Sequence, residues 1–179
     1  MKSILEMLGL GETAKAAPER TTETVCKIVS ELEAMDAAKA RYVAAFAYIL
    51  GRVAHADLHI SELETRKMEE FVHSLGHLPE DQSILVVQIA KSQNRLFGGT
   101  ENFLVTREFL EISSPEQRQE LLDCLFAVSA ADESISGVEE AQIRQIASEL
   151  GFSHRDYVEA RSVYNEHREV LKPLRGDKS

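Results

Sequence analysis

Apolar residues recur along most of the chain three or four positions apart, which is the spacing of a helix with one buried face. No stretch shows the sustained alternation of a strand. We therefore expect an all-α fold, a compact bundle of about eight helices joined by short loops. The second helix is apolar almost all round and should lie at the centre. The expected helices cover about 22–35, 38–56, 61–75, 79–89, 103–112, 115–131, 136–150 and 153–164.

The same pattern makes finer predictions. Ile84 and Val138 are assigned to the buried faces of their helices. Gly76 is expected to end its helix in the left-handed conformation that glycine adopts easily. Cys26 and Cys124 lie inside helical patterns without metal or redox spacing, so we interpret them as small buried apolar residues.

An internal repeat organises the chain. Residues 45–81 align with residues 120–156 without a gap, and identical residues keep one register through both copies. Scattered chance matches would not do so. Each copy is predicted to be a helix, a corner and a second helix, and a pseudo-twofold axis should relate the two. Taken more widely, the repeats cover about 38–94 and 114–165 of a helical domain at 21–173.

Two segments are expected outside this domain: an N-terminal arm and linker at 1–20 and a tail at 174–179. The arm carries five apolar residues on a weak helical period. They could pack back on the domain, stay disordered, or dock on a partner or a membrane surface. These residues are Ile4, Leu5, Met7, Leu8 and Leu10.

The charge balance argues against nucleic acid as a partner. The chain has 30 acidic and 20 basic side chains and a formal net charge of -10, so most of its surface should repel phosphate backbones. It shows neither a signal peptide nor an apolar run long enough to span a membrane. We therefore expect a cytoplasmic protein, with peripheral contact at the inner membrane left open.

The corners of the two repeats carry the candidate chemistry. Ser61 with Glu64, and Ser136 with Glu139, each fit a capping box, in which serine and glutamate side chains satisfy the first amides of a helix. Such a cap contributes ~1 kcal/mol. Capping alone therefore explains these serines and glutamates without any ligand.

The aspartates of the corners need another explanation. Asp57 and Asp132 each end an apolar helix, where the helix dipole disfavours negative charge. Loop amides could compensate them, and so could a divalent cation such as calcium, which prefers several carboxylate oxygens. Both interpretations stay open. Brought together by pseudo-symmetry, the corners would offer a cation Asp57, Glu64, Asp132 and Glu139, with Glu62, Glu133 and Glu140 nearby.

Several familiar sites are excluded by spacing. An EF-hand needs an oxygen ligand at its twelfth position, where the two copies have Met68 and Ile143. His55 and His59 flank the first corner but have no counterparts in the second, which argues against a symmetric zinc site. The chain also lacks a nucleophile elbow, a phosphate-binding loop and a dinucleotide fingerprint.

An apolar helix ending in Ala-Asp, followed by Ile-Ser and a glutamate seven residues after the aspartate, occurs twice. In this the chain resembles the tellurite-resistance protein B (TerB) family over roughly residues 38–165. The resemblance implies a compact all-helical bacterial domain, related to cytoplasmic tellurite and stress-resistance proteins, with acidic positions proposed to bind divalent metal. The family often has glycine after the aspartate, where this chain has Leu58 and Glu133. The matching acidic positions are Asp57, Glu64, Asp132 and Glu139.

Two classes of function follow. The favoured one is a non-enzymatic helical module that binds a protein partner in a stress- or envelope-associated complex, with weak divalent-cation binding at the corners. The alternative is a small metal-dependent hydrolase that uses the paired carboxylates. Self-association into a homo-oligomer is left open.

Overall fold

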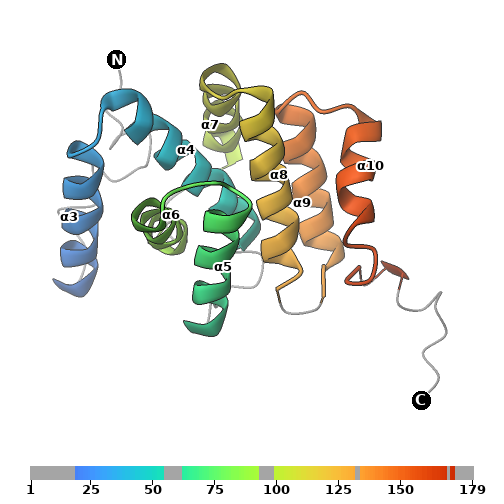
Figure 1. Cartoon of the computed structure of the whole chain (residues 1–179), viewed down its shortest axis with the longest axis horizontal. Coiled ribbons are helices and arrows are strands. Elements are labelled where there is room, and N and C mark those ends of the chain that lie inside the picture. Colours follow the sequence, from blue (N-terminus) through green and yellow to red (C-terminus); the bar gives the residue numbers. More distant parts are fainter. Residues whose placement is uncertain (1–18, 55–61, 93–98, 132–133, 169, 172–179) are drawn as a thin grey trace.

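The computed structural model describes residues 19–54, 62–92, 99–131, 134–168 and 170–171. These residues form eight α-helices, which confirms the predicted fold class and the predicted order of elements (Figure 1). The helices are α3 (Glu19–Glu33), α4 (Ala37–Ala54), α5 (Glu62–Ser74), α6 (Glu80–Ser92), α7 (Gly99–Ile112), α8 (Pro115–Ser129), α9 (Gly137–Glu149) and α10 (His154–Ser162).

Helix α4 is the centre of the bundle, as its apolar pattern predicts. It packs on α3, α6, α7, α8 and α9. Tyr48, Ile49 and Leu50 are consecutive and all fully buried, so the helix is enclosed on every side over this turn. Its alanines Ala44, Ala45 and Ala47 are also fully buried, and their small side chains let neighbouring helices approach closely.

The remaining helices are arranged around α4, with α6 lying between α3 and α5 and so out of chain order. Figure 1 shows α3 at one end of the molecule and α10 at the other. Between them, α6 packs on α3 and α5, α5 packs on α8, and α8, α9 and α10 lie side by side. The first predicted corner lies between α4 and α5, and the second lies between α8 and α9. Because α4, α5 and α9 all pack on α8, the helices that flank the two corners are neighbours.

The contacts between the two predicted repeats are reciprocal. Helix α4 packs on α8, α5 packs on α8, and α9 packs on α4. A pseudo-twofold axis would exchange α4 with α8 and α5 with α9; it would leave the α4–α8 contact unchanged and interchange the α5–α8 and α9–α4 contacts. The superposition of residues 45–81 on residues 120–156 stays a prediction, because part of each corner lies outside the described residues.

The two equivalent glycines at the repeat ends have different roles. Gly151 has a φ of 83°, a left-handed conformation. At the first copy, His77 has the positive φ of 50°, so the predicted left-handed Gly76 is wrong. Gly76 is required for space: an added Cβ would lie 2.5 Å from the carbonyl oxygen of Val72 and 3.2 Å from Cζ of Phe46.

Three predicted burials are wrong. Ile84 is 36% exposed and Val138 is 70% exposed, because each is turned away from the buried face of its helix. Cys26 is exposed, whereas Cys124 is buried as predicted. In α3 the buried face is carried by Ile28, and Cys26 does not lie on it.

The predicted arm and tail fall largely outside the described residues. Residues 1–18 and 172–179 are not described, and α3 begins at Glu19, inside the predicted linker. None of the helices among the described residues is long and apolar enough to cross a membrane.

Candidate functional site: the second corner and the arginine cluster beside it

The structure places the four predicted acidic residues unequally. Glu64 lies in the first turn of α5 and Glu139 in the first turn of α9. Asp57 and Asp132 lie outside the described residues. The structure therefore describes one acid of each corner, and the convergence of all four acids stays a prediction.

The capping box of α9 is confirmed. The Oγ atom of Ser136 accepts a hydrogen bond from the Glu139 amide at 3.2 Å, and Oε2 of Glu139 accepts one from the Ser136 amide at 2.9 Å. Glu139 is buried. One of its carboxylate oxygens therefore already serves the end of its own helix. Its partner box in the first copy begins at Ser61, outside the described residues.

A lysine from the first repeat reaches the second corner. Nζ of Lys67, on α5, donates a hydrogen bond at 2.7 Å to the carbonyl oxygen of Ala131. Ala131 directly follows Ala130, the C-cap of α8, and positive charge is favoured beside this end of a helix, where the last carbonyls have no partners within the helix. The ammonium group thus compensates part of the negative helix end that immediately precedes Asp132.

The chain after α10 is fastened to the other side of this corner. We call residues 163–168 the strap. The amide of Ile135 donates to the carbonyl oxygen of His167 at 2.7 Å, and Ile135 and Arg168 form an isolated parallel bridge. Tyr164 of the strap stacks on Phe126 of α8, with ring centroids 5.6 Å apart. The strap therefore holds the residues that lead into α9.

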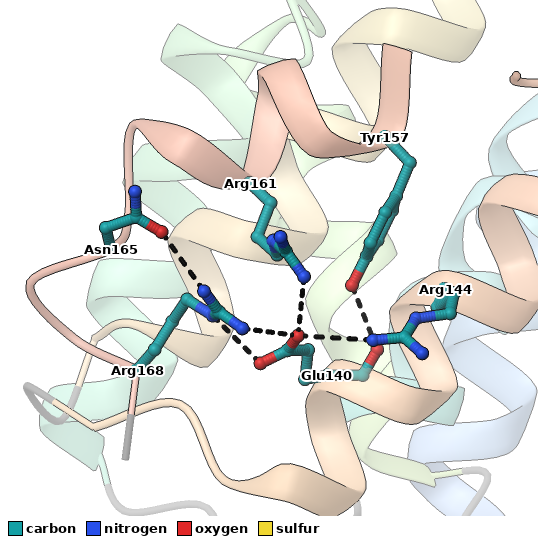
Figure 2. Close-up of polar contacts among 6 residues, drawn as sticks. All are labelled: Glu140, Arg144, Tyr157, Arg161, Asn165 and Arg168. Atoms are coloured by element: carbon teal, nitrogen blue, oxygen red, sulfur yellow. Dashed lines mark hydrogen bonds and ion pairs between the residues drawn. The ribbon is translucent and has the colours of Figure 1, made fainter. Parts of the chain in front are cut away.

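One buried carboxylate anchors the strap. Figure 2 shows three guanidinium groups converging on Glu140 of α9. Arg168 makes a bidentate contact, with Nε 2.9 Å from Oε2 and Nη2 2.8 Å from Oε1. Arg161 of α10 donates to Oε1 at 3.0 Å, and Arg144 approaches the same oxygen at 3.4 Å. Bidentate arginine–carboxylate contacts are among the strongest charged hydrogen bonds in proteins.

The charged state of Glu140 is favoured by its partners. Burial by itself would raise the pKa of this carboxyl group, but the hydrogen bonds and charges of Arg168 and Arg161 outweigh burial. The pKa of Glu140 is therefore held below its ordinary value. Glu140 remains ionised at neutral pH and keeps the strap in place.

Tyr157 of α10 joins the same cluster. Its hydroxyl group donates to the backbone carbonyl of Glu140 at 3.4 Å. The Cζ atoms of Arg144 and Arg161 lie 5.7 Å and 5.4 Å from the centroid of its ring. Both distances are within the range of cation–π attraction. The ring therefore helps to fix the two guanidinium groups.

A second buried ion pair lies at the end of α4. Arg52 donates to Glu149 of α9 at 2.8 Å and to Oγ1 of Thr106, on α7, at 2.6 Å. Gln142, with its amide oxygen facing Arg52, accepts from Nε at 3.2 Å. Burial would raise the pKa of Glu149, but the hydrogen bond and charge of Arg52 hold it low. This network ties three helices together just before the first corner.

The spacing of the sequence could not reveal these clusters. Glu140 appears in it only as one more carboxylate near the corner, whereas the structure uses it to bind arginines. Its main partner, Arg168, follows the last helix, and Arg52 is similarly remote from Glu149. The one local signal is the four-residue spacing of Glu140 and Arg144, which is common on exposed helices and singles out nothing.

The described residues contain no group of three or more His, Cys, Asp or Glu side chains that could hold a metal ion. Asp57 and Asp132 lie outside these residues, so the absence does not extend to the predicted cation site, which stays a prediction.

A family model described as tellurite resistance protein TerB matches residues 43–162, which include α5 to α10 and most of α4. The match covers both predicted corners and ends before the strap. No curated protein and no solved structure gives a significant match to the chain.

Proposed function

Because the chain belongs to the TerB family, we propose that it is a non-enzymatic helical module that binds a protein partner in a stress- or envelope-associated complex. The resemblance recognised in the sequence, over roughly residues 38–165, is confirmed by the family match over 43–162. The family supports the kind of domain, and the second corner supports the binding role.

The observation that carries the binding role is the bracing of the second corner. Lys67 holds the carbonyl of Ala131 on one side, and the strap holds the amide of Ile135 on the other. The capping box of Ser136 fixes the start of α9. The described residues on both sides of the corner are thus fixed by hydrogen bonds, and fixed flanking residues reduce the conformational entropy that is lost on binding, which favours affinity.

We further propose weak binding of a divalent cation, such as calcium, at the acidic corners. Its ligands would be Asp57, Glu64, Asp132 and Glu139. Two features support the weakness of this site. One oxygen of Glu139 is engaged by the Ser136 amide, and the Lys67 ammonium already supplies positive charge beside the second corner.

The cation proposal is tested by calorimetric titration of calcium, magnesium, manganese and zinc. Wild type is compared with the Asp57→Asn/Asp132→Asn double variant, and thermal melting is followed in parallel. A cation that binds only the folded state should raise the melting temperature of wild type by mass action. Absence of heat and of any melting shift for all four ions at millimolar concentration would remove the cation site.

The partner proposal is tested separately. Wild type and the double variant serve as bait in an extract of the native cell, with calcium or with a chelator. A protein retained by wild type and lost with the double variant supports a partner site at the corners. Equal recovery on both baits places the partner elsewhere, and no specific recovery counts against the module.

The alternative of a metal-dependent hydrolase would need the carboxylates of both corners to face one open cleft. Glu139 instead turns one oxygen onto the amide of Ser136, the N-cap of its own helix. The position of this carboxylate therefore favours the binding module over the hydrolase.

A further inference from the structure

The cluster around Glu140 has more positive charge than its carboxylate neutralises. Arg144, Arg161 and Arg168 all contact this one acid. A local excess of positive charge is unexpected in a chain whose formal net charge is -10. Such a cluster should attract anions locally even though the whole molecule repels them.

The three arginines are bound differently. Arg168 uses Nε and Nη2 on Glu140 and donates from Nη1 to Asn165 at 3.2 Å, so each of its nitrogens has a partner. Arg144 and Arg161 each approach Glu140 through a single nitrogen. Arg168 therefore accounts for the anchoring of the strap, and the other two arginines exceed what anchoring requires.

Arg144 and Arg161 also have hydrogen-bonding capacity left. The side chain of Arg144 is 59% exposed, so a ligand can reach it from solvent. The Nε atom of Arg161 is buried and has no hydrogen-bond partner among the described residues. A buried donor without a partner destabilises the fold unless something accepts from it or it can turn toward an acceptor.

The ring of Tyr157 prepares these two side chains for binding. Both guanidinium groups lie against it, and Figure 2 shows both turned toward Glu140 beside the ring. Stacking holds the planar fork of an arginine in one orientation. Oriented forks suit the paired oxygens of carboxylates and phosphates.

We propose that Arg144 and Arg161 bind an oxyanion group of a ligand, a carboxylate or a phosphate, on the solvent side of the Glu140 cluster. The anion would neutralise the remaining charge and accept hydrogen bonds from the two arginines. This site uses none of the acidic-corner ligands and does not rest on the proposed function.

The test uses inorganic phosphate and acetate as separate probes. Each is titrated into the isotope-labelled full chain at constant ionic strength set with sodium chloride, and amide and arginine Nε signals are followed by NMR. Saturable shifts are expected at residues 140–144 and 157–161. Tighter phosphate binding assigns the site to phosphate-bearing ligands, and tighter acetate binding assigns it to carboxylates.

Variants decide whether the arginines are responsible. Arg144→Met should weaken binding about tenfold, since a charged hydrogen bond is lost. The affinity of Arg144→Lys should fall between those of wild type and Arg144→Met, because lysine keeps the charge but lacks the planar guanidinium group. Arg161→Met should weaken binding too. Arg107→Met removes an exposed arginine from α7, paired with Glu111, and serves as the matched control.

Melting curves check that Arg144→Met is folded, as its exposed position predicts. Three results would overturn the proposal: no saturable shift with either probe, full binding in both Arg144→Met and Arg161→Met, or an equal loss in Arg107→Met.

Discussion

At Glu140 a single carboxylate faces three guanidinium groups while it is almost completely shielded from water. The net contribution of such a pair is small, because desolvation of the charges offsets much of their attraction. Removal of one partner is a different matter, since it leaves the others buried without a counter-ion. The importance of this residue therefore lies in what its loss would leave behind.

Glu140→Gln should lower the free energy of unfolding by about 3 kcal/mol at neutral pH, because Arg161 and Arg168 would keep their charges without the carboxylate. Urea unfolding followed by circular dichroism measures the difference. Glu159→Gln, at an exposed position of α10, removes the same charge and should change stability by less than about 0.5 kcal/mol. Equal effects of the two variants would contradict the role given to Glu140.

The pH dependence of the same variant carries a definite sign. Glu140 has a lower pKa in the folded chain than the ordinary value of 4.5, so the folded state binds its proton less readily than the unfolded state. Its contribution is fully present above the ordinary pKa and is lost as the pH falls through the lower folded pKa. The stability difference between wild type and Glu140→Gln should therefore shrink below about pH 4.5. A difference that stays constant down to acid unfolding would refute this.

At the scale of the helices, the two repeats end at the same Leu-Gly dipeptide for different physical reasons. Gly151 is needed for its positive φ, and nothing lies within 4 Å of the place where its Cβ would be. Gly76 is needed because the space is filled by Val72 and Phe46. Identical residues in one register thus do not imply identical geometry. A sequence pattern cannot separate these causes, because both select glycine.

Substitutions separate the two causes. Gly76→Ala should destabilise by about 2 kcal/mol through overpacking, and Gly151→Ala by about 1 kcal/mol through its left-handed backbone. Asparagine tolerates that backbone, so Gly151→Asn should be milder than Gly151→Ala, whereas the larger side chain should make Gly76→Asn worse than Gly76→Ala. Thermal or urea unfolding of the four variants measures the order.

Gly137 provides the control for these substitutions. It lies at the start of α9, it has no positive φ, and a Cβ added there would meet nothing within 4 Å. Gly137→Ala should therefore leave stability unchanged or raise it by up to about 1 kcal/mol, since alanine favours helix. The reverse order, with Gly76→Ala harmless and Gly137→Ala destabilising, would mean that the glycine roles are assigned wrongly.

At the scale of the whole molecule, the helices and the α9 cap could be predicted because their causes are local. Apolar spacing marks a buried face, and Ser136 with Glu139 forms a cap within four residues. The cluster at Glu140 could not be predicted in the same way. It joins α9 to Arg168 across the intervening α10, and only the packing of the bundle brings the two residues together. The predicted convergence of the acidic corners depends on such packing too, and stays a prediction.

The strap connects the end of the described chain to the second corner. A substitution in the strap should therefore change the backbone dynamics at Ile135, which is remote from it in the sequence. Arg168→Ala removes the anchor on Glu140, so the strap should detach more often and release the hydrogen bond between the Ile135 amide and His167. Hydrogen exchange at the Ile135 amide should accelerate about tenfold or more, because detachment of the strap would expose this amide more often than the openings that expose it in wild type.

The amides of α4 are buried and lie far from the strap in the sequence. Their exchange rates should change only as much as the global free energy of unfolding changes. Arg155→Ala removes an exposed arginine at the start of α10 and is the matched control; it should leave Ile135 unchanged. Hydrogen exchange resolved by NMR measures the rates at Ile135 and in α4 for wild type and for both variants. Acceleration spread evenly over α4 and Ile135 would show that Arg168 contributes only to global stability. A selective effect at Ile135 would establish that the strap controls the second corner.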